Sequence, residues 1–230
     1  MLAAPINPAD INMVQGSYAI LPSLPAVGGN EGVAEVEEVG AKVDRLKLGD
    51  WVVPSDAGFG TWRTVAVCAE TSLQRIPKKL PLAMAAMLSV NPCTALRMLR
   101  DFVPLNPGNV TITSSNDDIN DAYLIFQLIT LQFCYYRPEL EAMVAQLKAI
   151  GADHVFTEEE LRKPALNDVF KPRLALNLDS SGTYALIFRN LHIRGFWITQ
   201  WKKDNAHVRD LVTLTLGGKL KIELRGAMQV

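Results

Sequence analysis

The amino-acid sequence changes character near Pro77, and this change restricts the possible folds more than any other feature of the chain. Before Pro77, short β-branched runs such as Gly32–Gly40 are separated by glycine and proline, which is typical of strands and tight turns. After it, Leu82–Leu88 has helix-forming residues at helical spacing. The sequence therefore predicts a β-rich domain over residues 1–80 and a second domain over residues 81–230. The expected strands of the first domain are residues 32–40, 51–54 and 64–67.

The second domain alternates between short apolar runs and segments with helical spacing. Such an alternation predicts a parallel sheet flanked by helices, which places the chain in the α/β class. We expect strands at residues 110–113, 153–156, 173–179 and 194–198, and helices at residues 92–102, 121–131 and 138–150. The interval between the last two strands is short for a crossover that contains a helix, so we expect the doubly wound sheet to be incomplete.

The composition excludes several classes of function. With 230 residues, 49% hydrophobic composition and a net charge of -1, the chain can bury sizeable cores but has no basic cluster suited to nucleic acid. The longest apolar run, Tyr123–Cys134, is interrupted by polar residues and is too short to cross a bilayer as a helix. We therefore expect a globular protein with no nucleic-acid partner and no insertion into a membrane.

The cysteines and histidines form no metal-binding pattern. The cysteines lie far apart, without the CxxC pairs that structural zinc sites and redox dithiols need; they are Cys68, Cys93 and Cys134. The histidines likewise have no ligand-like spacing; they are His154, His192 and His207. The sequence therefore predicts no metal site.

Several stretches of the chain resemble the medium-chain dehydrogenase/reductase enzymes. The stretches that match the catalytic domain of that superfamily are residues 3–12, 24–32, 49–52 and 60–62. Those that are similar to its mitochondrial trans-2-enoyl-thioester reductase branch are residues 90–95, 147–161 and 194–204. The resemblance implies a GroES-like β-rich catalytic domain, shortened at its N-terminus, followed by an incomplete Rossmann-like doubly wound domain.

This branch is zinc-free and similar to the quinone oxidoreductases. The resemblance implies NADPH-dependent reduction of trans-2-enoyl thioesters, carried by CoA or acyl-carrier protein, to saturated acyl thioesters in mitochondrial fatty-acid synthesis. It also implies a location in the mitochondrial matrix and a homodimer joined through the region around residues 188–197. The residues after Met1 contain no Arg- and Ser-rich transit segment, which leaves a cytoplasmic location open.

The motif Gly29–Asn30–Glu31 separates this chain from the zinc-dependent enzymes of the superfamily. Those enzymes have Gly-His-Glu at the matching place, because zinc binds histidine nitrogen and thiolate sulfur. We therefore expect a metal-free reductase. By resemblance, Asn30 borders the substrate pocket.

Tyr18 is the candidate catalytic residue. Reduction of an enoyl thioester builds negative charge on the carbonyl oxygen and requires a proton at the α carbon, and a phenolic hydroxyl can serve both needs. In the family the tyrosine that follows Ile-Asn-x-x-Gln-Gly is the proton donor, and Ile11–Tyr18 matches this pattern. The residue type alone favours an aromatic ring that only packs in a loop, whereas the flanking match favours the proton donor.

Trp197 lies in a segment that borders the acyl pocket in the family, so by resemblance it lines a tunnel for the fatty chain. A core aromatic within the strand-like run Arg194–Ile198 explains this tryptophan equally well. The sequence leaves both interpretations open.

The turn after the first strand of the second domain is the expected nucleotide site. A dinucleotide fold needs glycines there, so that backbone amides can approach the pyrophosphate. Aligning Ser115 and Asn116 with the family's turn puts Asp118 and Asn120 at the two glycine positions. A carboxylate beside a diphosphate costs on the order of several kcal/mol. Ser115 and Asn116 are therefore the candidate NADPH contacts, and Asp118 and Asn120 are predicted to oppose binding.

Two further polar features of this region have competing explanations. The second strand of the family fold is compressed into residues 131–139, where Arg137 is the candidate for holding the 2′-phosphate of NADPH. Arg137 also matches an Arg-Pro pair that follows a few residues later in the family pattern.

The carboxylates at residues 117, 118 and 121 suggest a cation site, but capping and the helix dipole explain acidic residues at a helix start better.

A second hypothesis follows from the changed turn and the contracted sheet. A missing central strand leaves backbone hydrogen-bonding groups and apolar faces uncovered. The chain would then be a catalytically inactive, degenerate or splice-derived copy that acts only as an interaction partner of a complete subunit. Binding of NADPH and turnover of an enoyl-CoA distinguish the two hypotheses.

Overall fold

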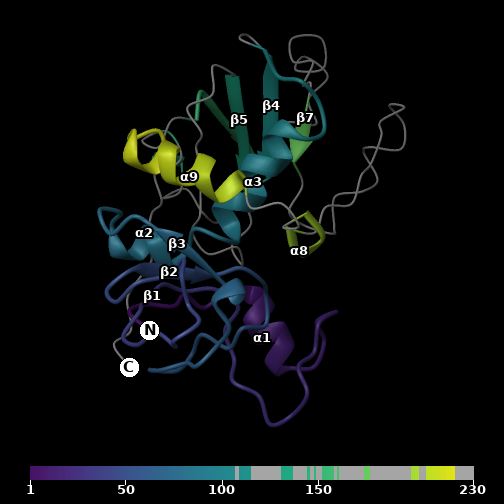
Figure 1. Cartoon of the computed structure of the whole chain (residues 1–230). Coiled ribbons are helices and arrows are strands. Elements are labelled where there is room, and N and C mark those ends of the chain that lie inside the picture. Colours follow the sequence, from purple (N-terminus) through teal and green to yellow (C-terminus); the bar gives the residue numbers. More distant parts are fainter. Residues whose placement is uncertain are drawn as a thin grey trace. The chain divides into compact units, whose positions relative to one another are not determined.

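The computed structural model of the chain describes residues 1–106, 109–114, 131–136, 144–145, 148, 152–157, 160, 174–176, 198–201 and 206–220 (Figure 1). Its contacts divide the chain into two compact units. One unit consists of Met1–Ala95 with Trp197–Val230, and the other consists of Leu96–Phe196. Each unit contains its own sheet.

The first unit contains an antiparallel sheet with the strand order β1–β2–β3 (Figure 1). Its strands are β1 (Ala34–Glu35), β2 (Trp51–Pro54) and β3 (Leu73–Ile76). In the central strand, Val52 and Val53 point to opposite faces and are both buried. Both faces of the sheet are therefore covered at this position, and β2 confirms the strand predicted at residues 51–54.

Two other predicted strands differ from expectation. Of residues 32–40, only β1 pairs in the sheet, and residues 64–67 form no strand. Val65 and Val67 are 62% and 99% exposed. β-branched residues favour a pleated, half-buried surface rather than a strand as such, and these two valines find no such surface in the described structure.

Helix α1 (Pro8–Val14) begins with two favourable residues. Pro8 lacks the N–H group that the first turn of a helix leaves unpaired in any case. Asp10 lies in the positive first turn and accepts a hydrogen bond from the backbone N–H of Asn7 at 2.8 Å.

The other short helical elements are η1 (Glu70–Ser72), α2 (Leu82–Ala86) and α8 (Ile198–Trp201). Helix α3 (Asn91–Arg100) spans the boundary between the units.

Helix α9 (Ala206–Leu216) is not among the predicted elements. Val208, Leu211 and Thr215 are buried, and their spacing puts them on one face of the helix. The helix ends before a glycine pair in which Gly218 has φ +68°, a typical helix C-terminus. The spacing of these residues and the glycine pair are signals that the sequence contains.

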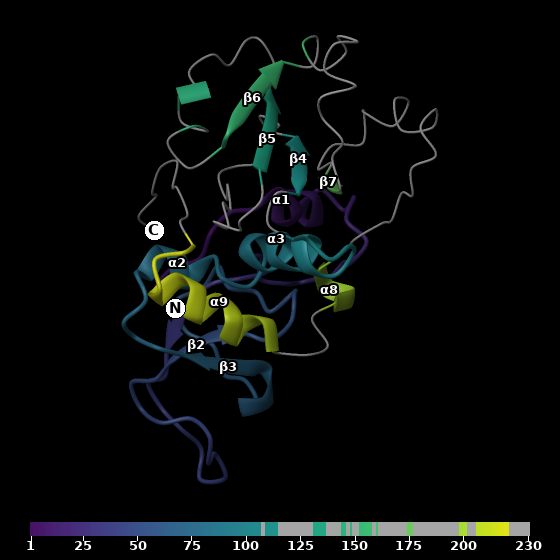
Figure 2. The same cartoon turned by 90° about the horizontal axis from the view of Figure 1, so that it is seen from above.

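The second unit contains a parallel sheet with the strand order β6–β5–β4–β7. Its strands are β4 (Val110–Ser114), β5 (Leu131–Tyr136), β6 (His154–Thr157) and β7 (Leu174–Leu176). Figure 2 shows β4, β5 and β6 side by side. The parallel pairing confirms the predicted α/β class. Counted along the chain from β4, the order is 3-2-1-4, which is the order found around the switch point of a doubly wound dinucleotide-binding sheet.

The remaining predicted elements are described only in part. Residues 121–130 lie outside the described residues, and Leu131 begins β5 rather than ending a helix. Residues 194–197 also lie outside them, and Ile198 begins α8 rather than ending a strand. Within the described ranges, no helix is both long and apolar enough to cross a membrane.

A close backbone contact joins the stretch Gly28–Gly29 to Trp62. The backbone N–H of Trp62 donates to the carbonyl of Gly28 at 2.9 Å, and its indole N–H donates to the carbonyl of Pro5 at 3.1 Å. A Cβ atom on Gly29 would lie 2.3 Å from Oγ1 of Thr61 and 2.6 Å from the ring of Trp62. Gly29 also has φ +93°, in the left-handed region that favours glycine. Both backbone conformation and space therefore require glycine here.

We predict that Gly29→Ala lowers the free energy of unfolding by about 2–5 kcal/mol, because left-handed strain of ~1–2 kcal/mol adds to overlap of ~1–3 kcal/mol. Gly16→Ala is the matched control, since Gly16 has φ +73° but nothing within 4 Å of an added Cβ atom. In the control, the free energy of unfolding should fall only by the contribution of the left-handed strain. Urea unfolding of both variants measures the difference, and equal losses would mean that the contact with Trp62 does not restrict this position.

Candidate functional site

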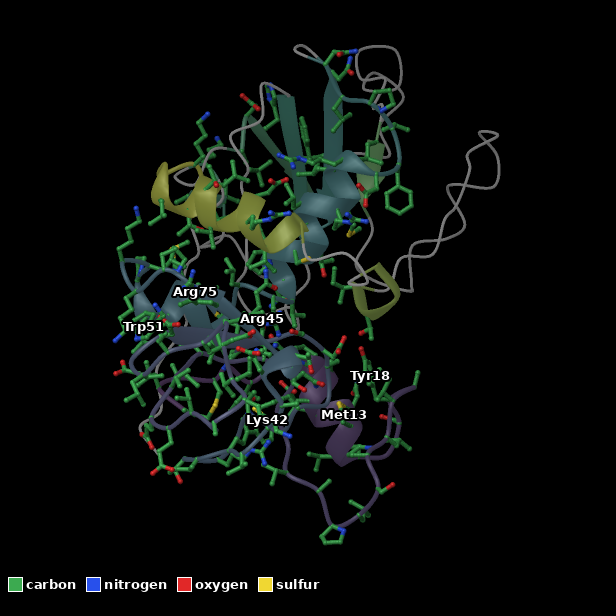
Figure 3. All side chains as sticks on the ribbon, in the orientation of Figure 1. Met13, Tyr18, Lys42, Arg45, Trp51 and Arg75 are labelled. Atoms are coloured by element: carbon green, nitrogen blue, oxygen red, sulfur yellow. The ribbon has the colours of Figure 1, made fainter. Side chains whose placement is uncertain are left out.

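Tyr18 follows α1 at the end of a segment that is tied back onto the helix (Figure 3). The backbone N–H of Gly16 donates to the carbonyl of Met13 at 3.1 Å, and that of Ser17 donates to the carbonyl of Asn12 at 2.9 Å. The hydroxyl of Ser17 donates to the same carbonyl at 3.2 Å. Tyr18 itself is half-buried. The position of Tyr18 therefore depends on the position of α1.

Asn30 joins α1 to the loop that contains Gly58. Its side-chain nitrogen donates to Oδ1 of Asp10 at 2.6 Å and lies 3.0 Å from Sδ of Met13. Its Oδ1 accepts a hydrogen bond from the backbone N–H of Gly58 at 2.7 Å. Asn30 is only 6% exposed. Both polar groups of this side chain are thus used by neighbouring parts of the protein, and its predicted place at the border of a substrate pocket stays a prediction.

Glu31 is a fully buried carboxyl group that accepts hydrogen bonds from separate segments of the chain. Its Oε1 accepts from the side-chain nitrogen of Asn7 at 2.8 Å. Its Oε2 accepts from the hydroxyl of Ser89 at 3.2 Å and from the backbone N–H of Val90 at 2.9 Å. The side chain of Asn91 donates in turn to Oδ1 of Asn7 at 3.1 Å. Because a buried carboxyl group is costly without such partners, Glu31 fixes the start of α1 to the residues that precede α3.

The buried polar cluster formed by Asn7, Asp10, Asn30 and Glu31 is not predicted from the sequence as a unit. A signal for it exists, since these residues lie inside the two apolar stretches that match the catalytic domain, residues 3–12 and 24–32. Polar side chains at buried positions need hydrogen-bond partners. The sequence could therefore have suggested that the two stretches contact each other through these residues.

Some charged side chains on the surface of the first unit form ion pairs, and Figure 3 labels two of their basic members, Arg45 and Arg75. Arg45 lies 3.4 Å from Glu70, and Nζ of Lys78 lies 3.0 Å from Glu35. The hydrogen bond from Lys78, together with one from the indole of Trp51, lowers the pKa of Glu35. Exposed pairs of this kind contribute little to stability. None of these residues is a candidate for the chemistry.

The described cysteines and acidic residues provide neither an activated nucleophile nor a metal centre. Cys93 is buried and Cys68 is exposed. Desolvation raises the pKa of the Cys68 thiol, and the positive charge of Arg63 offsets this only in part. A raised pKa reduces the fraction of reactive thiolate. In the parts of the chain that the structure describes, no three His, Cys, Asp or Glu side chains come together as a metal-binding group.

Several candidate residues lie outside the described residues; they are Ser115, Asn116, Asp118, Asn120, Arg137 and Trp197, together with the proposed dimer region 188–197. The predictions for them stay predictions. The structure does describe β4, which ends at Ser114 directly before the candidate nucleotide turn. Because β4 has β5 on one side and β7 on the other, this turn follows the strand at which the sheet order reverses. Dinucleotides bind at that place in doubly wound sheets.

The sequence is similar to known proteins along nearly its whole length. Residues 1–78 match the family described as the alcohol dehydrogenase GroES-like domain. The mitochondrial enoyl-[acyl-carrier-protein] reductase of Xenopus tropicalis is 47% identical over 96% of this chain and 76% of its own length. The protein of the same name from Homo sapiens is 47% identical over 90% of this chain. The chain spans 65% of the length of this human relative.

The fold is similar to that of solved enoyl thioester reductases. A mutant of Etr1p in complex with NADP and crotonyl-CoA matches 95% of this chain and 79% of its own chain, with a TM-score of 0.83 and 28% identity. The mitochondrial 2-enoyl thioester reductase Etr1p/Etr2p heterodimer from Candida tropicalis matches 99% of this chain and 80% of its own chain, with a TM-score of 0.75 and 27% identity.

These comparisons confirm the predicted fold class, a GroES-like domain combined with a Rossmann-like domain. The relatives are named mitochondrial enoyl-[acyl-carrier-protein] reductases, in agreement with the predicted functional class and location. The roles of Tyr18 and Asn30 stay predictions. With 47% identity to the Xenopus protein over 76% of that protein's length, the chain belongs to the mitochondrial enoyl-[acyl-carrier-protein] reductase family.

Proposed function

We propose that this chain reduces trans-2-enoyl thioesters, carried by CoA or acyl-carrier protein, to saturated acyl thioesters with NADPH in mitochondrial fatty-acid synthesis. The observation that carries the proposal is the likeness to Etr1p in complex with NADP and crotonyl-CoA, over 95% of this chain with a TM-score of 0.83. The names of the relatives support the same reaction. Because the chain spans 65% of the human relative, the activity has to be tested on this chain itself.

Tyr18 is the proposed proton donor. When bound, NADPH supplies a hydride to the β carbon of the unsaturated thioester. The hydroxyl of Tyr18 then stabilises the negative charge on the thioester carbonyl oxygen by a hydrogen bond and gives its proton to the α carbon. The tyrosine takes up a new proton from water after each turnover. The hydrogen bonds of Gly16 and Ser17 to the last turn of α1 support this role, because they fix the backbone just before Tyr18.

NADPH is proposed to bind at the carboxyl end of β4. The strand order β6–β5–β4–β7 supports this position, since the sheet order reverses at β4. The proposed contacts are Ser115 and Asn116 in the turn, with Arg137 at the 2′-phosphate. Asp118 and Asn120 oppose binding, because both bring a side chain to a position where the family's turn has glycine, and Asp118 also brings negative charge.

The proposal also assigns residues to the acyl pocket and bounds to the two domains. Trp197 is proposed to line the pocket and Asn30 to lie at its border. The catalytic domain is proposed to extend over residues 1–80 and the nucleotide-binding domain over residues 81–230. The family match, which ends at residue 78, supports this boundary. The two compact units of the structure divide the chain differently, because Trp197–Val230 belongs to the first unit.

A non-catalytic subunit is the second candidate function. Two different chains, Etr1p and Etr2p, form a heterodimer in the Candida tropicalis structure. Asp118 and Asn120 favour this candidate, because a chain that cannot hold NADPH could still pair with a complete subunit. A catalytically active chain is instead proposed to form a homodimer.

We predict that the purified chain oxidises NADPH with saturable kinetics only when a trans-2-enoyl-CoA such as crotonyl-CoA is present. Tyr18→Phe should lower kcat by about 10²-fold or more, because general acid catalysis contributes roughly 10²–10⁴-fold. The KM should change little, since phenylalanine keeps the ring. The loss of NADPH absorbance measures the rate, and circular dichroism checks that the variant is folded. Full activity of the variant would exclude Tyr18 as the proton donor.

We predict that Asp118→Gly/Asn120→Gly binds NADPH at least about tenfold more tightly than the unchanged chain, a difference of ~1.4 kcal/mol. Glu38→Gln is the control for lost charge, since Glu38 is exposed in the first unit. Titration calorimetry measures the affinities. Equal affinity of the unchanged chain and the double variant would mean that the two side chains do not oppose binding. No binding by either would favour the non-catalytic subunit.

A further inference from the structure

The amide of Asn30 lies between a hydrogen-bond acceptor and a hydrogen-bond donor. The carboxyl group of Asp10 offers an acceptor at 2.6 Å, and the backbone N–H of Gly58 offers a donor at 2.7 Å. A side chain between them must donate on one side and accept on the other, which fixes the orientation of the asparagine amide. Alanine would remove the hydrogen bonds to Oδ1 of Asp10 and to the N–H of Gly58 from a side chain that is 6% exposed. Aspartate would put a second carboxyl group against Asp10.

The contacts of Asn30 on α1 come from both turns of that helix. Asp10 and Met13 are three residues apart and therefore lie on the same helix face. The helix has seven residues, which is too short to be stable without tertiary contacts. Asn30 thus holds the face of a helix whose last turn is hydrogen-bonded to the residues just before Tyr18.

We propose that Asn30 is a positioning residue for Tyr18, which acts through Asp10 and α1 to hold the tyrosine hydroxyl at the reacting carbon. This inference rests on the proposed function, because it concerns the efficiency of proton transfer. It assigns Asn30 a role that differs from lining the pocket. An Asn30 that only lined the pocket would change substrate binding, whereas a positioning residue changes the rate at which bound substrate receives its proton.

The first test exchanges the two partners. Asn30→Asp places two carboxyl groups together and should break the bridge, while Asp10→Asn/Asn30→Asp restores one amide and one carboxylate in reversed order. Asp10→Asn alone leaves one carbonyl oxygen for two donors, the amide of Asn30 and the backbone N–H of Asn7, so that one donor loses its partner. This variant serves if Asn30→Asp does not fold. Hydrogen exchange followed by mass spectrometry should show faster exchange of residues 10–18 in each single variant, by about tenfold or more for ~1.4 kcal/mol of lost local stability. The reversed pair should restore the protection, and β2 should be unchanged in all variants.

The second test asks whether Asn30 acts through Tyr18. In the unchanged background, Asn30→Asp or Asp10→Asn should lower kcat by roughly 10–100-fold, since a misplacement of about 1 Å can cost that much. The KM for crotonyl-CoA and the Kd for NADPH should stay within about twofold. In the Tyr18→Phe background the same substitution should cause almost no further loss, because the group it positions is already absent.

The outcomes separate the inference from the proposed function. Unchanged exchange of residues 10–18 in both single variants would overturn the bridge, and so would a reversed pair that folds but fails to restore protection. Equal losses of kcat with and without the Tyr18 hydroxyl would reduce Asn30 to a structural residue. If the unchanged chain does not reduce crotonyl-CoA, the proposed function fails and the kinetic role of Asn30 fails with it. The exchange experiment still decides whether the bridge holds α1.

Discussion

Two buried carboxyl groups, those of Asp10 and Glu31, determine how the first unit is assembled. A buried carboxyl group without hydrogen-bond donors costs several kcal/mol, so each segment that supplies a donor is held against it. Asp10 takes its donors from Asn7 and Asn30. Glu31 takes donors from Asn7 and from the residues just before α3. The position of α1, and with it the position of Tyr18, follows from these bonds.

The proposed proton transfer from Tyr18 requires that α1 be held in a fixed position. A proton donor contributes to the rate only when its hydroxyl is held close to the productive geometry. Helix α1 has seven residues and cannot supply that precision alone. The stretch Gly28–Glu31 supplies it from one side, where Asn30 and Glu31 bind the helix. Trp62 holds the same stretch through its close contact with Gly28 and Gly29 and its backbone hydrogen bond to Gly28.

The features that could be predicted from the sequence are those that depend on residues close together along the chain. The parallel sheet follows from local periodicity, and the family follows from continuous motifs such as Ile11–Tyr18. The shortness of β1 and the exposure of Val67 depend on which strands lie nearby, and β-branched residues alone do not determine that. The bond between Asn30 and Gly58 joins residues far apart in the sequence. No local pattern contains such a bond, so the pocket assignment of Asn30 could be made only by resemblance.

The measurement that tests the central claim most directly is the labelling of the product formed from crotonyl-CoA and NADPH in heavy water. If the chain is an enoyl thioester reductase with a solvent-exchanging tyrosine as its acid, mass spectrometry will detect butyryl-CoA with one deuterium at the α carbon and none at the β carbon. Saturated product without solvent deuterium at the α carbon would contradict the role of an exchangeable hydroxyl. Absence of saturated product would contradict the assignment of reductase activity to this chain.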